Sequence, residues 1–137
     1  MYIEKIILKS LSLKNVILQD KSLKNIGIPL RYRPDVVMYF PSKMHYIVLE
    51  IDERQHNGYD IQKEYARYLN INKELKRLGT VKWIRFNPDG YRSPKPKVAL
   101  CKRLKMLKSE IYKSKKNPRN DITHMFYSCN NKHKLLL

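Results

Sequence analysis

Three runs of mostly apolar residues predict three strands in the middle of the chain. Arg33 to Phe40 reads as one strand, with Pro34 tolerated at its start because no backbone donor is needed there. His45 to Asp52 is a second, rich in β-branched residues, and Pro41 to Met44 is a turn between them. The first two strands are therefore expected to form an antiparallel hairpin. Thr80 to Phe86 is the third strand.

Helical periodicity appears in three other places. Residues 2–12 have apolar positions at 3, 7, 8 and 11, which suits a short amphipathic helix. Asp60 is a candidate N-cap for a helix that Gly79 ends. A third helix over about 97–113 carries a narrow leucine and isoleucine stripe, and residues 15–19 are a further candidate strand.

These elements predict an α/β (α+β) domain, a mixed β-sheet flanked by helices. Residues 1–113 form this single domain, with its core motifs in 31–90 and a basic helix at about 97–113. Residues 114–137 are polar, basic and interrupted by Pro118, so a loosely ordered tail is expected there. With 137 residues, of which 42% are hydrophobic, one ordinary core is possible.

The net charge of the chain indicates the kind of partner that it binds. The formal net charge is +17, and residues 92–137 hold 13 basic residues against 2 acidic ones. A surplus of this size favours a polyphosphate partner, DNA first, although composition does not separate DNA from RNA. An anionic membrane surface is the rival, but it requires an exposed apolar helix face that the core is expected to use. No membrane partner is therefore expected.

The two cysteines are too few for a disulfide framework and have no zinc-ligand spacing. The first ten residues include an acid and a lysine, unlike a signal peptide, and no apolar run is long enough to span a bilayer. We therefore expect an intracellular protein in a reducing compartment, cytoplasm or nucleus.

Carboxylates at the ends of buried strands are the candidate chemistry. Glu50 and Asp52 end an apolar run and alternate, so they project from one face, while Asp35 begins the partner strand. A tight turn would make paired residue numbers sum to about 85, setting Asp35 opposite Glu50. Three oxygen ligands gathered in this way suit Mg²⁺ or Mn²⁺. The alternative is that these acids only form ion pairs with nearby arginines.

These residues resemble a known nuclease superfamily. Pro34-Asp35 followed by Glu50-x-Asp52 is similar to the PD-(D/E)xK pattern, and the order Gln55-His56, Glu64-x-x-Arg67 and Arg85 is similar to very-short-patch-repair-like endonucleases and nuclease-like proteins of large DNA viruses. The resemblance implies a restriction-endonuclease-like fold and a Mg²⁺-dependent endonuclease or nickase that hydrolyses phosphodiester bonds.

The resemblance also implies roles for individual residues. Asp35, Glu50 and Asp52 would be catalytic acids and metal ligands, with Glu64 as a further ligand or a favourable helix-dipole partner. His56 would be a general base, if not a surface histidine, and Gln55 would position phosphate or water. Two departures from the pattern stand out. Asp52 occupies the place of the usual lysine, and Glu53 that of a small residue. They keep open a non-catalytic nucleic-acid-binding protein on a decayed nuclease fold.

Nucleic-acid contacts are expected from basic and polar side chains around the acids and along the last helix. The side chains near the acids could equally be solvated or bind phosphate. The helix at 97–113 carries more cations than a merely solvated helix face needs, so phosphate binding is expected there. The candidates are Arg33, Arg54, Arg67, Arg85, Asn87, Lys102, Arg103, Lys105 and Lys108.

Overall fold

The computed structural model describes residues 2–52, 60–88 and 99–126. Three helices and five strands are present in these ranges. The helices are α1 (Tyr2–Leu11), α2 (Ile61–Lys76) and α3 (Leu100–Lys116), and short 3-10 turns lie at Leu23–Ile26 and Pro41–Lys43. The strands are β1 (Val16–Gln19), β2 (Val36–Phe40), β3 (His45–Ile51), β4 (Thr80–Phe86) and β5 (Asp121–Met125).

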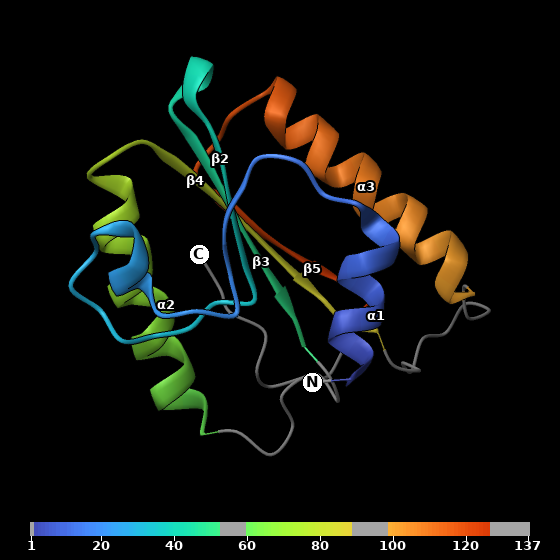
Figure 1. Ribbon diagram of the computed structural model, residues 1–137, viewed down its shortest axis with the longest axis horizontal. Helices are drawn as coiled ribbons and strands as arrows, with labels where there is room; N and C mark the ends of the chain where they lie inside the picture. The colour runs from blue at the N-terminus through green and yellow to red at the C-terminus, as the bar shows by residue number, and fades with distance from the viewer. Residues whose placement is uncertain (1, 53–59, 89–98, 127–137) are drawn as a thin grey trace.

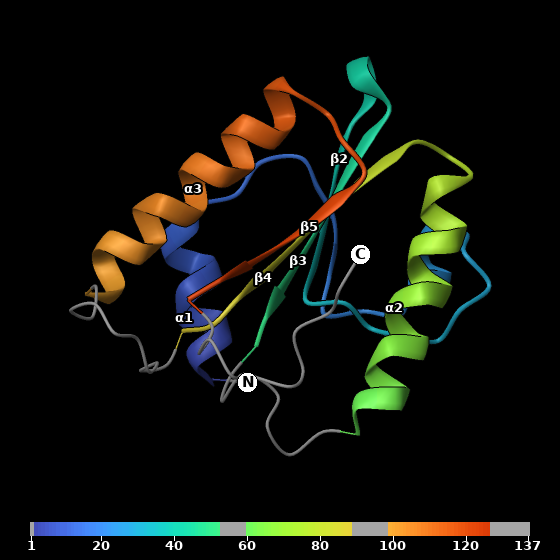
Figure 2. The same ribbon diagram turned by 180° about the vertical axis from the view of Figure 1, so that it is seen from behind.

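The strands form one mixed sheet in the order β1-β2-β3-β4-β5. The first three are antiparallel neighbours, while β4 pairs in parallel with both β3 and β5. Helices cover both faces, with α2 on one side and α1 with α3 on the other (Figures 1 and 2). The predicted fold class, a mixed sheet flanked by helices, is confirmed.

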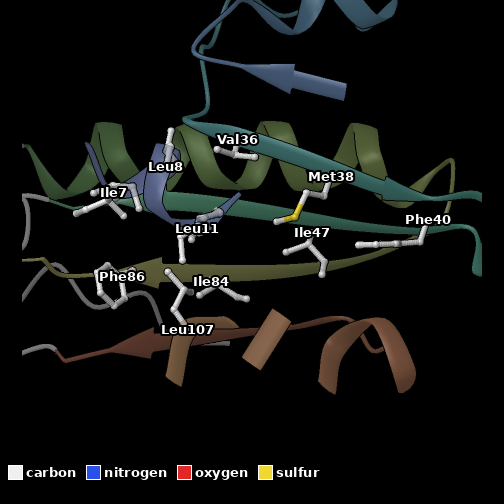
Figure 3. Packing of buried hydrophobic residues seen from close by; sticks show 12 residues of the cluster. Ile7, Leu8, Leu11, Val36, Met38, Phe40, Ile47, Ile84, Phe86 and Leu107 are labelled. Atoms are coloured by element: carbon white, nitrogen blue, oxygen red, sulfur yellow. The ribbon is translucent and has the colours of Figure 1, made fainter. Parts of the chain in front are cut away.

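Each face of the sheet has its own apolar core. Ile7, Leu11 and Leu107 from the α1 and α3 side pack on alternate strand residues such as Ile47 and Ile84 (Figure 3). The opposite residues of the same strands pack against α2, where Tyr68 meets Trp83 with ring centroids 4.9 Å apart. Strand residues buried on both sides explain why the middle of the chain reads as nearly continuous apolar runs.

The hairpin has the predicted register. Val37 pairs with Val48 and Phe40 with His45, so the paired numbers sum as expected, and Pro41–Lys43 makes the turn. Gly79 is required behind this turn, because a Cβ there would lie 2.0 Å from the carbonyl oxygen of Met44. Thr80 donates its N–H to that same carbonyl at 3.0 Å.

The prediction of a loosely ordered tail is wrong for residues 114–126. The helix continues to Lys116, and β5 follows within the segment expected to be irregular. The strand is anchored by polar contacts that composition does not reveal: Asn120 Oδ1 accepts from the N–H of Val81 at 2.8 Å, and Lys82 Nζ lies 2.6 Å from Asp121 Oδ1. The rest of the expected tail, residues 127–137, lies outside the described residues.

No helix in the described ranges is both long and apolar enough to cross a membrane.

Candidate functional site

Two acids meet where the β2–β3 hairpin opens. Asp35 directly precedes β2, and Glu50 is the last but one residue of β3. The N–H of Asp35 donates to Glu50 Oε2 at 3.2 Å, and the N–H of Ile51 donates to Asp35 Oδ2 at 2.6 Å. The predicted cross-strand placement of Asp35 beside Glu50 is therefore confirmed, and backbone donors fix both carboxyl groups in position.

A third acid, Glu4, reaches this pair from α1 and was not among the predicted site residues. Its half-buried side chain lies close enough to Asp35 and Glu50 for their charges to affect the pKa of Glu4. Carboxylates gathered so closely repel one another, which disfavours the charged form of each. A signal for it exists in the sequence. Glu4 shares the helical face of Leu8 and Leu11, so it lies on the buried side of an amphipathic helix, where an unpaired acid is costly.

Crowding perturbs the acids of this cluster. Burial, and then the neighbouring Glu50 carboxylate, raise the pKa of Asp35 to about 9. Burial also raises the pKa of Glu4. No ion pair among the described residues involves Asp35, so little positive charge offsets its carboxylate. Carboxyl pKa values that are raised by burial and a neighbouring like charge occur often at functional sites.

Asp52 and Glu64, also predicted as metal ligands, lie elsewhere in the cluster. Both bind Arg85, which projects from β4 toward α2 and is only 2% exposed. Arg85 Nε is 2.7 Å from Asp52 Oδ2, and its Nη2 is 2.6 Å from Glu64 Oε1. Asp52 is fully buried, so this triad fastens the first turn of α2 to the end of β3.

Arg67 binds the remaining acid. It lies one turn after Glu64 on α2, and its Nη1 is 2.5 Å from Glu50 Oε1. The Arg67 side chain keeps 20% of its surface exposed, which sets it apart from the enclosed Arg85. Both arginines were predicted to contact nucleic acid. In this structure both contact acids of the candidate site, and Arg85 is enclosed there while Arg67 remains partly exposed.

The chemistry of these donors fits a divalent ion, while their arrangement does not present them together. Carboxylate oxygens are the ligands that Mg²⁺ and Mn²⁺ prefer. In the described part of the chain, however, no three Asp, Glu, His or Cys side chains are placed to hold one ion. The physical reason is visible in the ion pairs: Arg67 takes an oxygen of Glu50, and Arg85 takes Asp52 and Glu64.

Of the other predicted residues near the acids, only Arg33 lies in the described part of the chain. Arg33 is exposed and donates to the carbonyl oxygen of Asp20 at 2.7 Å. His56 and Gln55, the predicted base and positioning residue, lie outside the described residues, as does Arg54.

Two predicted nucleic-acid contacts are buried at the end of β4. Asn87 is fully buried, and its Nδ2 donates to the carbonyl oxygen of Phe126 at 2.9 Å. Arg103 is 6% exposed and donates to the carbonyl oxygens of Asn87 and Pro88 at 2.9 and 3.2 Å. Asn87 therefore joins the carboxyl end of β4 to the residue after β5, and Arg103 joins it to α3. Both side chains are buried in these structural contacts.

The predicted lysines of the last helix do face solvent. They extend along the outer side of α3 together with three further exposed lysines near its end: Lys102, Lys105, Lys108, Lys113, Lys115 and Lys116. The first half of α3 lies at the end of the sheet where β3 and β4 finish (Figure 1).

Comparisons of this chain with models of protein families, with curated proteins and with solved structures found no match.

Proposed function

We propose that this chain is a metal-dependent endonuclease or nickase that hydrolyses phosphodiester bonds in DNA. One observation carries the proposal: Asp35 and Glu50 are fixed side by side at the mouth of the hairpin, with the pKa of Asp35 raised to about 9 by burial and by Glu50. The sequence resemblance to PD-(D/E)xK nucleases and the net charge of +17 support it.

Asp35 and Glu50 would hold a Mg²⁺ or Mn²⁺ ion, with Glu4 beside them as a third candidate ligand. Such an ion activates water and stabilises developing charge on a phosphate. Asp52 and Glu64 have a different role in this proposal. They keep Arg85 buried and so hold α2 against the sheet beside the acid pair.

The substrate would be held by sequence-independent phosphate contacts. The exposed α3 lysines, Lys102, Lys105 and Lys108 foremost, and exposed Arg33 supply the positive charge. His56 remains the proposed general base, and Gln55 the residue that positions water or phosphate.

The direct test is incubation of purified protein with supercoiled plasmid in Mg²⁺, Mn²⁺ or EDTA. We expect nicked or linear product with either metal and intact plasmid with EDTA. Glu50→Ala and Glu4→Gln should each reduce cleavage, and His56→Ala should slow it by about 10²-fold. Full activity in Glu50→Ala would refute the site.

A second candidate is a nucleic-acid-binding protein without catalysis. The ion pairs of Asp52 and Glu64 with Arg85 favour it, since acids that a metal site would use are held by an arginine instead. The two candidates differ in metal binding. A chain that binds DNA, shows no saturable Mn²⁺ binding and leaves plasmid intact would be the second.

A further inference from the structure

Two arginines from different elements lie at the acid cluster, and they differ in how they are held. Arg85 is enclosed by Asp52 and Glu64 and is 2% exposed. Moving its guanidinium would separate it from two buried carboxylates at once, so it is held in place. Arg67 instead is paired with Glu50 at a position where its side chain reaches solvent.

Arg67 also has hydrogen-bonding capacity left over. A guanidinium carries five N–H donors in a planar fork. Its Nη1 donates to Glu50, and its Nη2 makes one long contact of 3.4 Å with the carbonyl oxygen of Arg33. The side chain is 20% exposed. A guanidinium with N–H donors to spare suits the oxygens of a phosphate.

Glu50 is the acid on which the proposed function depends most, and both of its oxygens are engaged. Oε2 accepts from the N–H of Asp35, and Oε1 accepts from Arg67. The backbone donor cannot leave without opening the hairpin. The Arg67 side chain can swing away, because it ends a flexible stem and is partly exposed.

We propose that Arg67 is an exchangeable counter-ion of the site. In the metal-free chain it neutralises Glu50. If Glu50 held a divalent ion, the Arg67 guanidinium would be free to turn to a phosphate oxygen of the substrate. This inference rests on the proposed function. It gives the site a cation, although Asp52 stands where the pattern that the sequence resembles has a lysine.

The exchange predicts opposite effects on metal binding and on cleavage. A positive charge beside Glu50 opposes a second cation there, so its removal should tighten metal binding. Its removal should also slow cleavage, because a group that stabilises charge in the transition state is then missing. Loss of a residue that only supported the structure would weaken both.

The test is a Mn²⁺ titration without DNA, by calorimetry or by the electron paramagnetic resonance of free Mn²⁺, alongside plasmid cleavage. Arg67→Met should bind Mn²⁺ about tenfold more tightly than wild type and cleave about 10²-fold more slowly. Arg67→Lys, which keeps the charge, should bind Mn²⁺ like wild type. Lys63→Met is the matched control, because Lys63 is an exposed cation one turn earlier on α2.

Unchanged or weaker Mn²⁺ binding in Arg67→Met would overturn the exchange. Should that variant fail to fold, Arg67→Gln offers a second uncharged side chain with the same expected result. Wild-type protein that binds Mn²⁺ but leaves plasmid intact would refute the endonuclease, while the Mn²⁺ affinities would still decide the exchange. Wild-type protein without saturable Mn²⁺ binding would overturn both proposals.

Discussion

The N–H of Asp35 donates to Glu50 Oε2 at 3.2 Å, at the point where the β2–β3 hairpin opens. A second bond joins the same two strands in the opposite direction, since the carboxylate of Asp35 accepts from the N–H of Ile51, the β3 residue after Glu50, at 2.6 Å. Side-chain oxygens thus replace backbone carbonyls at the end of the ladder. The two acids cannot drift apart while the hairpin is formed, although like charges directly opposed across strands are destabilising.

Asp35→Asn should therefore stabilise the metal-free protein near neutral pH. In the folded chain Asp35 has a pKa of about 9, and in the unfolded chain a pKa near its ordinary value of 3.8. Its contribution to the free energy of unfolding is largest below pH 3.8 and is lost as pH rises toward 9. We expect a gain of about 1–3 kcal/mol at pH 8, measured by urea unfolding, and a much smaller gain at pH 4.

Asp20→Asn is the control for that experiment. Asp20 is an exposed acid whose backbone N–H donates to the carbonyl oxygen of Asp35 at 3.0 Å, and its carboxylate is 3.8 Å from Arg33. Its substitution should change stability by less than about 0.5 kcal/mol at either pH. A loss of stability in Asp35→Asn at pH 8 would show that the carboxylate is not under repulsion.

Arg85→Met should be strongly destabilising. The substitution leaves Asp52 and Glu64 buried without their shared cation, a loss of about 3–5 kcal/mol in the free energy of unfolding. Arg77→Met removes an exposed ion pair with Glu74 and should cost less than about 1 kcal/mol. Equal effects of the two substitutions would mean that the buried triad is not what fastens α2 to the sheet.

His45 should make the fold sensitive to mild acid. Its buried ring bridges Thr80 Oγ1 at 2.6 Å and Ser114 Oγ at 2.9 Å, and burial lowers its pKa below 6.5. The hydrogen bond with Thr80 and then the charge of Asp121 act in the opposite direction and raise the pKa, while Lys82 adds a smaller lowering effect. Burial outweighs the groups that raise it.

Because the unfolded chain takes up a proton near pH 6.5 and the folded chain only at lower pH, stability should be full above pH 7 and fall as pH drops below 6.5. His45→Gln should flatten this dependence between pH 7 and 5. Urea midpoints that fall equally in wild type and variant would place the sensitivity in another group.

The salt dependence of DNA binding should locate the phosphate contacts on α3. Changing Lys102, Lys105 and Lys108 together to Ala should reduce the log–log slope by up to about 0.9 for each phosphate that is no longer neutralised. Arg103 is left in place because it holds the carbonyl oxygens of Asn87 and Pro88. An unchanged slope would assign the phosphate contacts to another face.

The hairpin and the core strands are predictable because their apolar runs are long and Pro41 marks the turn between them. The same register argument places Asp35 beside Glu50, as the fold confirms. Periodicity also predicts α3, whose buried Leu107 lies in the expected stripe. Local pattern is informative where one element buries one face.

Long-range pairing is what the sequence does not reveal. Glu4 joins the site only because α1 packs near the end of β3, although the two elements are far apart in the sequence (Figure 1). The burial of Arg85 depends on two acids, one following β3 and one on α2. The strand β5 is short and polar, and it forms because the edge of β4 is available to it.

Plasmid cleavage by wild type and Asp35→Asn in Mg²⁺, measured side by side with their stabilities, tests the central claim most directly. We predict that wild type cuts and Asp35→Asn does not, while the variant is the more stable protein. That combination assigns the loss of cleavage to chemistry and not to unfolding. Equal cutting by the two proteins, or no metal-dependent cutting by wild type, would contradict the proposed site.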